Sequence, residues 1–176
     1  MKSITPMVAC LILGGLLFST ALAQDVRINE VNLSGGWIEL HNAGEEAVDV
    51  SAYQFCNRPA YAAVGDLEVV SGEMTIEPGG FLVLNWDAIA GDTAELGLYT
   101  SASFSSADAM VDYLAWGGAG GGRESVAVEA GLWAEGDFAA MPEAEQSLVY
   151  SDAGETMLEH WSAADATPGE ANPGSE

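Results

Sequence analysis

The feature that most limits the fold of this chain is its series of short apolar runs, each bounded by turn-forming residues. Residues 25–33 (DVRINEVNL) and 37–42 (WIELHN) alternate apolar and polar side chains around a tight Ser34-Gly35 turn, which predicts a β-hairpin. Residues 81–86 (FLVLNW) are apolar on both faces and predict a strand inside a sheet. Further strands are predicted at 47–50, 53–56, 67–70, 74–76, 96–99, 110–116 and 147–150.

Together these runs make about ten short strands at close intervals, a spacing typical of a β-sandwich or barrel. Only residues 124–133 have helical composition, and that segment is short. A helical or α/β fold requires several helical patterns of at least about 10–12 residues, and the sequence lacks them. We therefore expect an all-β sandwich of one domain with a single short helical segment.

The N-terminal segment predicts export. Lys2 supplies a positive start, residues 7–18 form an apolar run, and Ala21-Leu22-Ala23 matches the small-x-small pattern before a cleavage point. We expect a signal peptide over residues 1–23. An uncleaved membrane anchor would need roughly 20 apolar residues, more than this run offers. A lipoprotein signal ending at Cys10 is a further alternative, although Cys10 precedes most of the apolar stretch.

Export places the protein at the cell surface, in the periplasm or outside the cell. The remaining chain divides into one expected domain over residues 24–162 and a tail over residues 163–176. The tail is rich in proline, glycine, alanine and acidic residues, so we expect it to be disordered. No second apolar run follows the signal, and no membrane span is expected after cleavage.

The charge of the chain is strongly negative. Its formal net charge is −23, from 27 Asp plus Glu against 4 Lys plus Arg, and Lys2 is the only lysine. Concentrated salt would screen such self-repulsion, and bound divalent cations would neutralise carboxylates locally. We favour adaptation to a saline habitat, because the acids are scattered rather than gathered at fixed spacing. Nucleic acid is not an expected partner, since no basic patch is present to meet phosphates.

Cys56 is the only cysteine beyond the predicted signal peptide, so an intramolecular disulfide is excluded there. We predict a buried thiol, because residues 53–56 have the composition of a core strand. An intermolecular bridge is the alternative. Trp86 and Trp116 are also predicted to be core residues, with a carbohydrate-stacking platform as the alternative for the aromatic side chains.

The motifs of common catalytic and cofactor sites are missing. No Gly-x-Ser-x-Gly elbow occurs, and His41 and His160 are the only histidines, with His41 expected to face solvent. One cysteine and two separated histidines do not form a zinc set, and no calcium-binding loop motif occurs. The glycine run 117–122 departs from a phosphate-binding pattern at Arg123, so we interpret it as a flexible connector. We expect no cofactor and no enzymatic activity.

One pair of acidic residues suggests a sharper hypothesis. A hairpin closed at Ser34-Gly35 places Glu30 directly opposite Glu39, and like charges so placed destabilise a sheet. One of the two pKa values should then be raised. A bound cation or an arginine would relieve the repulsion, the arginines being Arg27, Arg58 and Arg123. The alternative is that solvent or backbone N–H groups satisfy both carboxylates.

Several segments together resemble the lamin tail domain family in its exported bacterial form. The opening hairpin is carried by Ile28-Asn29-Glu30-Val31 and residues 37–42, and the next strand and turn by residues 48–53. Residues 76–84 (IEPGGFLVL) resemble the family's Pro-Gly-led strand, and residues 111–117 (VDYLAWG) resemble a later one. Residues 167–172 (TPGEAN) resemble its closing tail, and a longer insertion at 119–145 departs from a compact member.

This resemblance implies an immunoglobulin-like β-sandwich with a role in binding or scaffolding, and it implies no active site. The expected function is therefore an exported, non-catalytic module that binds a protein or a polysaccharide. The first alternative is an acidic structural or matrix protein that recruits divalent cations. The second is a secreted hydrolase, which would require a cleft holding His41 near a nucleophile.

Overall fold

The hairpin predicted from residues 25–42 forms the middle of the larger sheet. In the computed structural model, which describes residues 25–89 and 91–175, β1 (Val26–Asn32) pairs antiparallel with β2 (Trp37–Asn42). Four residues connect the two strands, instead of the two that we predicted. Gly36 closes this loop: its N–H donates to the carbonyl of Asn32, and its φ of 68° favours glycine.

The larger sheet has six strands in the order β12-β11-β1-β2-β8-β6, and every pairing in it is antiparallel. Edge strand β6 carries a β-bulge where it meets β8, a common feature of sheet edges. Beyond the central hairpin, its strands are β6 (Glu68–Ser71), β8 (Phe81–Asn85), β11 (Gln146–Tyr150) and β12 (Trp161–Asp165).

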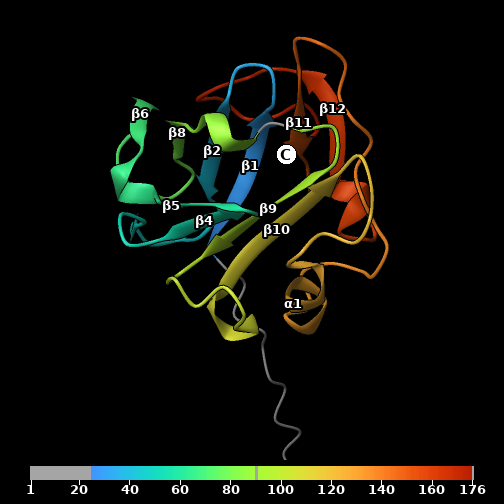
Figure 1. The fold of residues 1–176 in the computed structure, drawn as a ribbon. Helices are drawn as coiled ribbons and strands as arrows, with labels where there is room; N and C mark the ends of the chain where they lie inside the picture. The colour runs from blue at the N-terminus through green and yellow to red at the C-terminus, as the bar shows by residue number, and fades with distance from the viewer. Residues whose placement is uncertain (1–24, 90, 176) are drawn as a thin grey trace, which may run out of the picture.

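A second sheet of four antiparallel strands, in the order β10-β9-β4-β5, faces the first. Figure 1 shows β4, β9 and β10 crossing in front of β1 and β2. A small separate sheet pairs β3 with β7. The strands of these two sheets are β3 (Val48–Asp49), β4 (Gln54–Asn57), β5 (Ala60–Ala63), β7 (Thr75–Ile76), β9 (Ala94–Tyr99) and β10 (Met110–Trp116).

The core lies between the two main sheets. Leu40 and Leu84 from the larger sheet and Phe55, Leu98 and Trp116 from the smaller one are fully buried in a single hydrophobic cluster. The structure thus confirms the predicted all-β sandwich of one domain. Within residues 25–89 and 91–175, no helix is long and apolar enough to cross a membrane.

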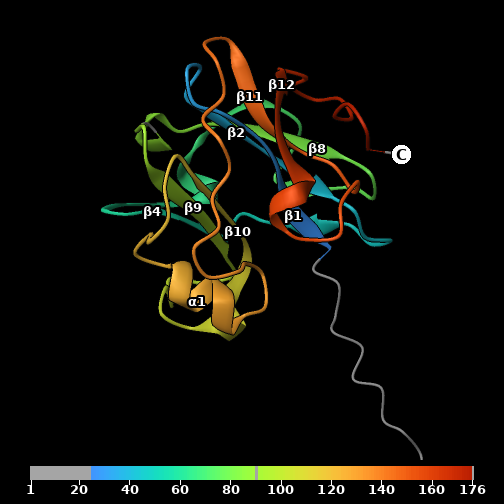
Figure 2. The same ribbon diagram turned by 90° about the vertical axis from the view of Figure 1, so that its right-hand side faces the viewer.

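Little helix is present in the described part of the chain. The segment predicted as helical at 124–133 forms a shorter helix, which packs beside β10 and lies near one end of the sandwich in Figure 2. The helices are α1 (Glu124–Glu129) and the short 3₁₀ helices η1 (Val64–Asp66), η2 (Asp87–Ile89), η3 (Ala107–Ala109) and η4 (Leu158–His160).

The C-terminal tail differs from the sequence prediction. We expected disorder over residues 163–176, but Trp161–Asp165 forms β12 and pairs with β11 along its whole length. The following segment, residues 166–175, lies against the outer face of the larger sheet, on the side away from β4, β9 and β10 in Figure 2. Backbone and side-chain hydrogen bonds to buried residues hold it there, and its composition alone does not reveal them. The predicted signal peptide at 1–23 lies outside the described residues.

Candidate functional site

The two carboxylates singled out in the sequence face each other as predicted. Glu30 is the direct partner of Glu39 in the β1–β2 pairing, and a register shift between Ile28 and Glu30 marks a bulge at Asn29. Both glutamates are fully buried on the outer face of the larger sheet. Residues 166–175, named here the C-terminal strap, cover them.

Hydrogen-bond donors of the strap, and not an arginine, approach the pair. The Thr167 N–H and hydroxyl donate to Glu30, with the hydroxyl 3.2 Å from Oε2. The Gly169 N–H donates to Glu39 Oε2, and Asn29 Nδ2 donates to Glu39 Oε1 at 2.7 Å. Each carboxylate therefore has at least two donors, which is the arrangement a buried carboxylate requires.

Burial is the main electrostatic effect at this pair. It raises the pKa of Glu39 to about 7, with the charge of Glu30 adding to the rise and the bonds from Gly169 and Asn29 opposing it. The described residues include no group of three or more His, Cys, Asp or Glu side chains that could hold a metal ion. The hydrogen bonds from Thr167 and Gly169 make the pair the place where the strap attaches to the larger sheet.

His41 lies on the same outer face, stacked on Phe81 with 4.6 Å between ring centroids. It is only partly exposed, and burial together with the charge of Arg27 lowers its pKa. A pocket of about 170 Å³ brings His41 near Ser175 and Asp152. The Ser175 hydroxyl donates to the Asn172 carbonyl and Asp152 pairs with Arg27 at 3.1 Å, so these side chains are not connected as a catalytic triad.

The remaining residues predicted from sequence are mostly core residues. Cys56 is a buried free thiol, as predicted, and burial raises its pKa. Trp116 is fully buried, while Trp86 is half-buried and stacks on Phe55. His160, at the end of η4, contacts the Tyr150 hydroxyl through Nδ1 at 3.1 Å.

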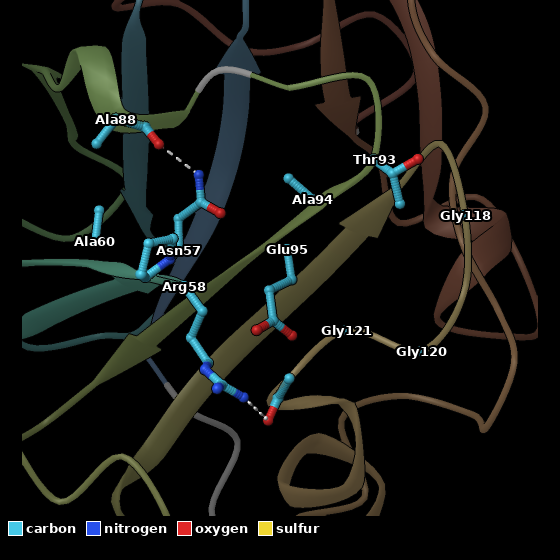
Figure 3. Close-up of a pocket in the computed structure, with 12 residues that line it drawn as sticks. Asn57, Arg58, Ala60, Ala88, Thr93, Ala94, Glu95, Gly118, Gly120 and Gly121 are labelled. Atoms are coloured by element: carbon cyan, nitrogen blue, oxygen red, sulfur yellow. Dashed lines mark hydrogen bonds between the residues drawn. The ribbon is translucent and has the colours of Figure 1, made fainter.

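A pocket lies at the end of the four-stranded sheet where β4 ends and β9 begins (Figure 3). Its volume is about 480 Å³, within the usual range for small-molecule sites. We call it the glycine-loop pocket, because residues 117–122 form one wall. It is lined by Asn57, Arg58, Pro59, Ala60, Ala88, Thr93, Ala94, Glu95, Gly118, Gly120, Gly121 and Gly122.

The glycine run has a defined structural role in this pocket, contrary to the flexible connector that we inferred. The Gly117 N–H donates to the Ala139 carbonyl, and Gly120 adopts a φ of 82°. A Cβ atom at Gly121 would collide with Glu95, and one at Gly122 would collide with Arg58. Only glycine allows the loop to approach these two side chains so closely.

Glu95 is a buried acidic residue in the lining of this pocket. It is 3% exposed, and its Oε2 accepts hydrogen bonds from the Tyr113 hydroxyl at 2.9 Å and from the Arg123 N–H at 2.8 Å. Its Oε1 is also buried but has no hydrogen-bond partner. A buried carboxylate oxygen without a donor is costly for a fold, and such atoms are often retained for function.

Arg58 and Asn57 border the same space. Figure 3 shows Arg58 reaching toward the loop, where its Nη1 donates to the Gly122 carbonyl at 3.3 Å. Asn57 is buried and donates to the Ala88 carbonyl. Within the described part of the chain, the only ion pair joins Arg27 and Asp152, so Arg58 does not neutralise Glu95 by direct contact.

Glu95 was not among the residues singled out from the sequence, because the strand that became β9 was predicted to begin at residue 96. Arg58 lines the same pocket, but the donor from Arg123 is a backbone N–H, which leaves no mark in the sequence. The burial of Glu95 itself depends on the fold of the glycine run. Comparison of the chain with protein-family models, curated proteins and solved structures found no match.

Proposed function

We propose that this chain is an exported, non-catalytic binding module of the lamin tail type, acting at the cell surface or outside the cell. The observation that carries the proposal is the glycine-loop pocket, in which a buried carboxylate oxygen of Glu95 lacks a donor. A ligand from a protein or polysaccharide partner would supply that donor. The resemblance in sequence described above supports the same reading.

Ligand binding tests this proposal. We expect a panel of short peptides and oligosaccharides, titrated into isotope-labelled protein of residues 24–176, to contain members that shift the amide resonances of Ala94, Gly118 and Gly121. These residues line the pocket, so their amides should respond before those of the strap. Shifts confined to other surfaces would contradict a binding role for the pocket. Chemical conversion of a panel member would contradict a non-catalytic one.

The acidic composition makes a separate prediction about salt. We expect the melting temperature to rise between about 0.05 and 1 M NaCl, because the screening length shortens to about 3 Å at the higher concentration. Thermal unfolding followed by circular dichroism measures this directly. An unchanged melting temperature would argue against adaptation to a saline habitat. Association on adding calcium but not sodium would instead favour the matrix-protein alternative.

A further inference from the structure

We propose that the glycine-loop pocket accepts the cationic head of a lysine or arginine side chain from a partner protein. This inference rests on the proposed binding function and specifies its ligand. Its first support is Glu95, whose free Oε1 is buried beside the pocket while Oε2 is fully engaged. An ammonium or guanidinium group supplies both the missing donor and the opposite charge, and such charge-assisted bonds are the strongest class.

The walls of the pocket fit the rest of a basic side chain. Ala60, Ala88 and Ala94, together with Pro59, contribute small apolar surfaces to the pocket. Lysine and arginine bury their methylene stems along such surfaces while the charged head meets a polar group. No aromatic residue lines the pocket, and the exposed large apolar side chains of the described chain include no tryptophan. The pocket thus lacks a platform on which a sugar ring would stack.

Neither of the nearby arginines, Arg58 and Arg123, forms an ion pair with Glu95 in the described part of the chain, so its carboxylate remains available to a ligand. Arg58 is exposed and directed to the Gly122 carbonyl, and the Arg123 guanidinium donates to Ser105 and Tyr61. Behind the glycine loop, the buried Glu124 carboxylate accepts the N–H groups of Gly120 and Gly136, which adds negative charge on that side. The net charge of −23 further raises the local concentration of cationic partners.

The test compares matched peptides in one NMR assay. The probes are Gly-Gly-Lys-Gly-Gly, its arginine counterpart, its norleucine counterpart and a panel of neutral oligosaccharides, all at about 0.15 M salt to screen weak surface attraction. We expect the lysine and arginine peptides to shift Ala94, Gly118 and Gly121, and the norleucine peptide to leave them unchanged. Glu95→Gln should weaken this binding about tenfold or more, whereas Glu129→Gln, which removes an exposed charge from α1, should not.

A second variant keeps the test decisive if Glu95→Gln fails to fold. Glu95 also accepts hydrogen bonds from the Tyr113 hydroxyl and the Arg123 N–H, so its replacement can disturb the glycine loop. Ala60→Leu adds bulk at the half-buried rim of the pocket and leaves the carboxylate intact, so it should weaken binding by a similar factor. Undiminished binding by both variants would overturn the inference. Pocket shifts with oligosaccharides alone would overturn the inference but leave the proposed function standing. No pocket shift with any probe would remove both.

Discussion

Replacing Glu39 by glutamine is expected to raise the free energy of unfolding by about 2–3 kcal/mol near pH 8 and to change it little near pH 4. The pKa of Glu39 is raised to about 7 in the folded protein, from an ordinary value of 4.5. The folded state therefore binds the proton more tightly than the unfolded chain does. The stabilisation linked to that proton is complete below 4.5 and is lost as the pH rises through 7.

Glutamine imitates the protonated carboxyl group and cannot ionise. Its oxygen can accept the Gly169 N–H that Glu39 Oε2 accepts now, and its NH₂ group would face Asn29. Rotation of the Asn29 side-chain amide then turns its oxygen toward that group and restores the second bond. The variant should therefore keep the strap in place while removing the cost of a buried charge beside Glu30.

Denaturant unfolding at a series of pH values measures the effect as the difference between variant and wild type. Asp112, whose pKa burial raises to about 6, also titrates in this range, but it is present in both proteins and cancels in the difference. Glu77→Gln removes an exposed charge and serves as the control. A difference between Glu39→Gln and wild type that does not change with pH would refute the assignment of a raised pKa to Glu39.

Most of the fold could be predicted because most of the strands carry their own apolar signal in the sequence. Residues 110–116 were predicted with the bounds that β10 has, and the ten predicted runs all coincide with strands. The two strands that were missed, β5 and β12, both lie at sheet edges. Both bury little apolar surface and show no apolar alternation, so β5 (AYAA) and β12 (WSAAD) are hard to distinguish from loops.

The candidate sites were only partly predictable. The sequence predicted that Glu30 and Glu39 lie opposite each other, because the register of a hairpin determines which residues of its two strands are paired. Apart from Asn29, the donors that satisfy them come from residues more than a hundred positions away, at Thr167 and Gly169. Glu95 was missed for a similar reason, since its burial depends on a loop whose glycines give no sequence periodicity. Contacts of this kind arise only from the packed structure.

Truncation of the side chain at Asn172 is expected to loosen the strap, with a loss of about 2–3 kcal/mol in the free energy of unfolding. Asn172 is 3% exposed, and its Nδ2 donates to the carbonyls of Asn29 and Tyr150 at 2.8 and 2.9 Å. Its Oδ1 lies 3.0 Å from the Thr167 hydroxyl, whose single proton it shares with Glu30 Oε2. Asn172→Ala removes the donor from two carbonyls beneath the strap, and a buried acceptor without a donor is costly.

Hydrogen exchange distinguishes loosening of the strap from a general loss of stability. The Thr167 and Gly169 amides, which donate to Glu30 and Glu39, should exchange faster in Asn172→Ala, while amides of β4 and β9 should keep their protection under native conditions. Glu170→Gln alters an exposed side chain of the same segment and should leave both quantities unchanged. Equal acceleration at all these amides would show that Asn172 supports the whole sandwich. An unchanged rate at Gly169 would show that the glutamate pair holds the strap without it.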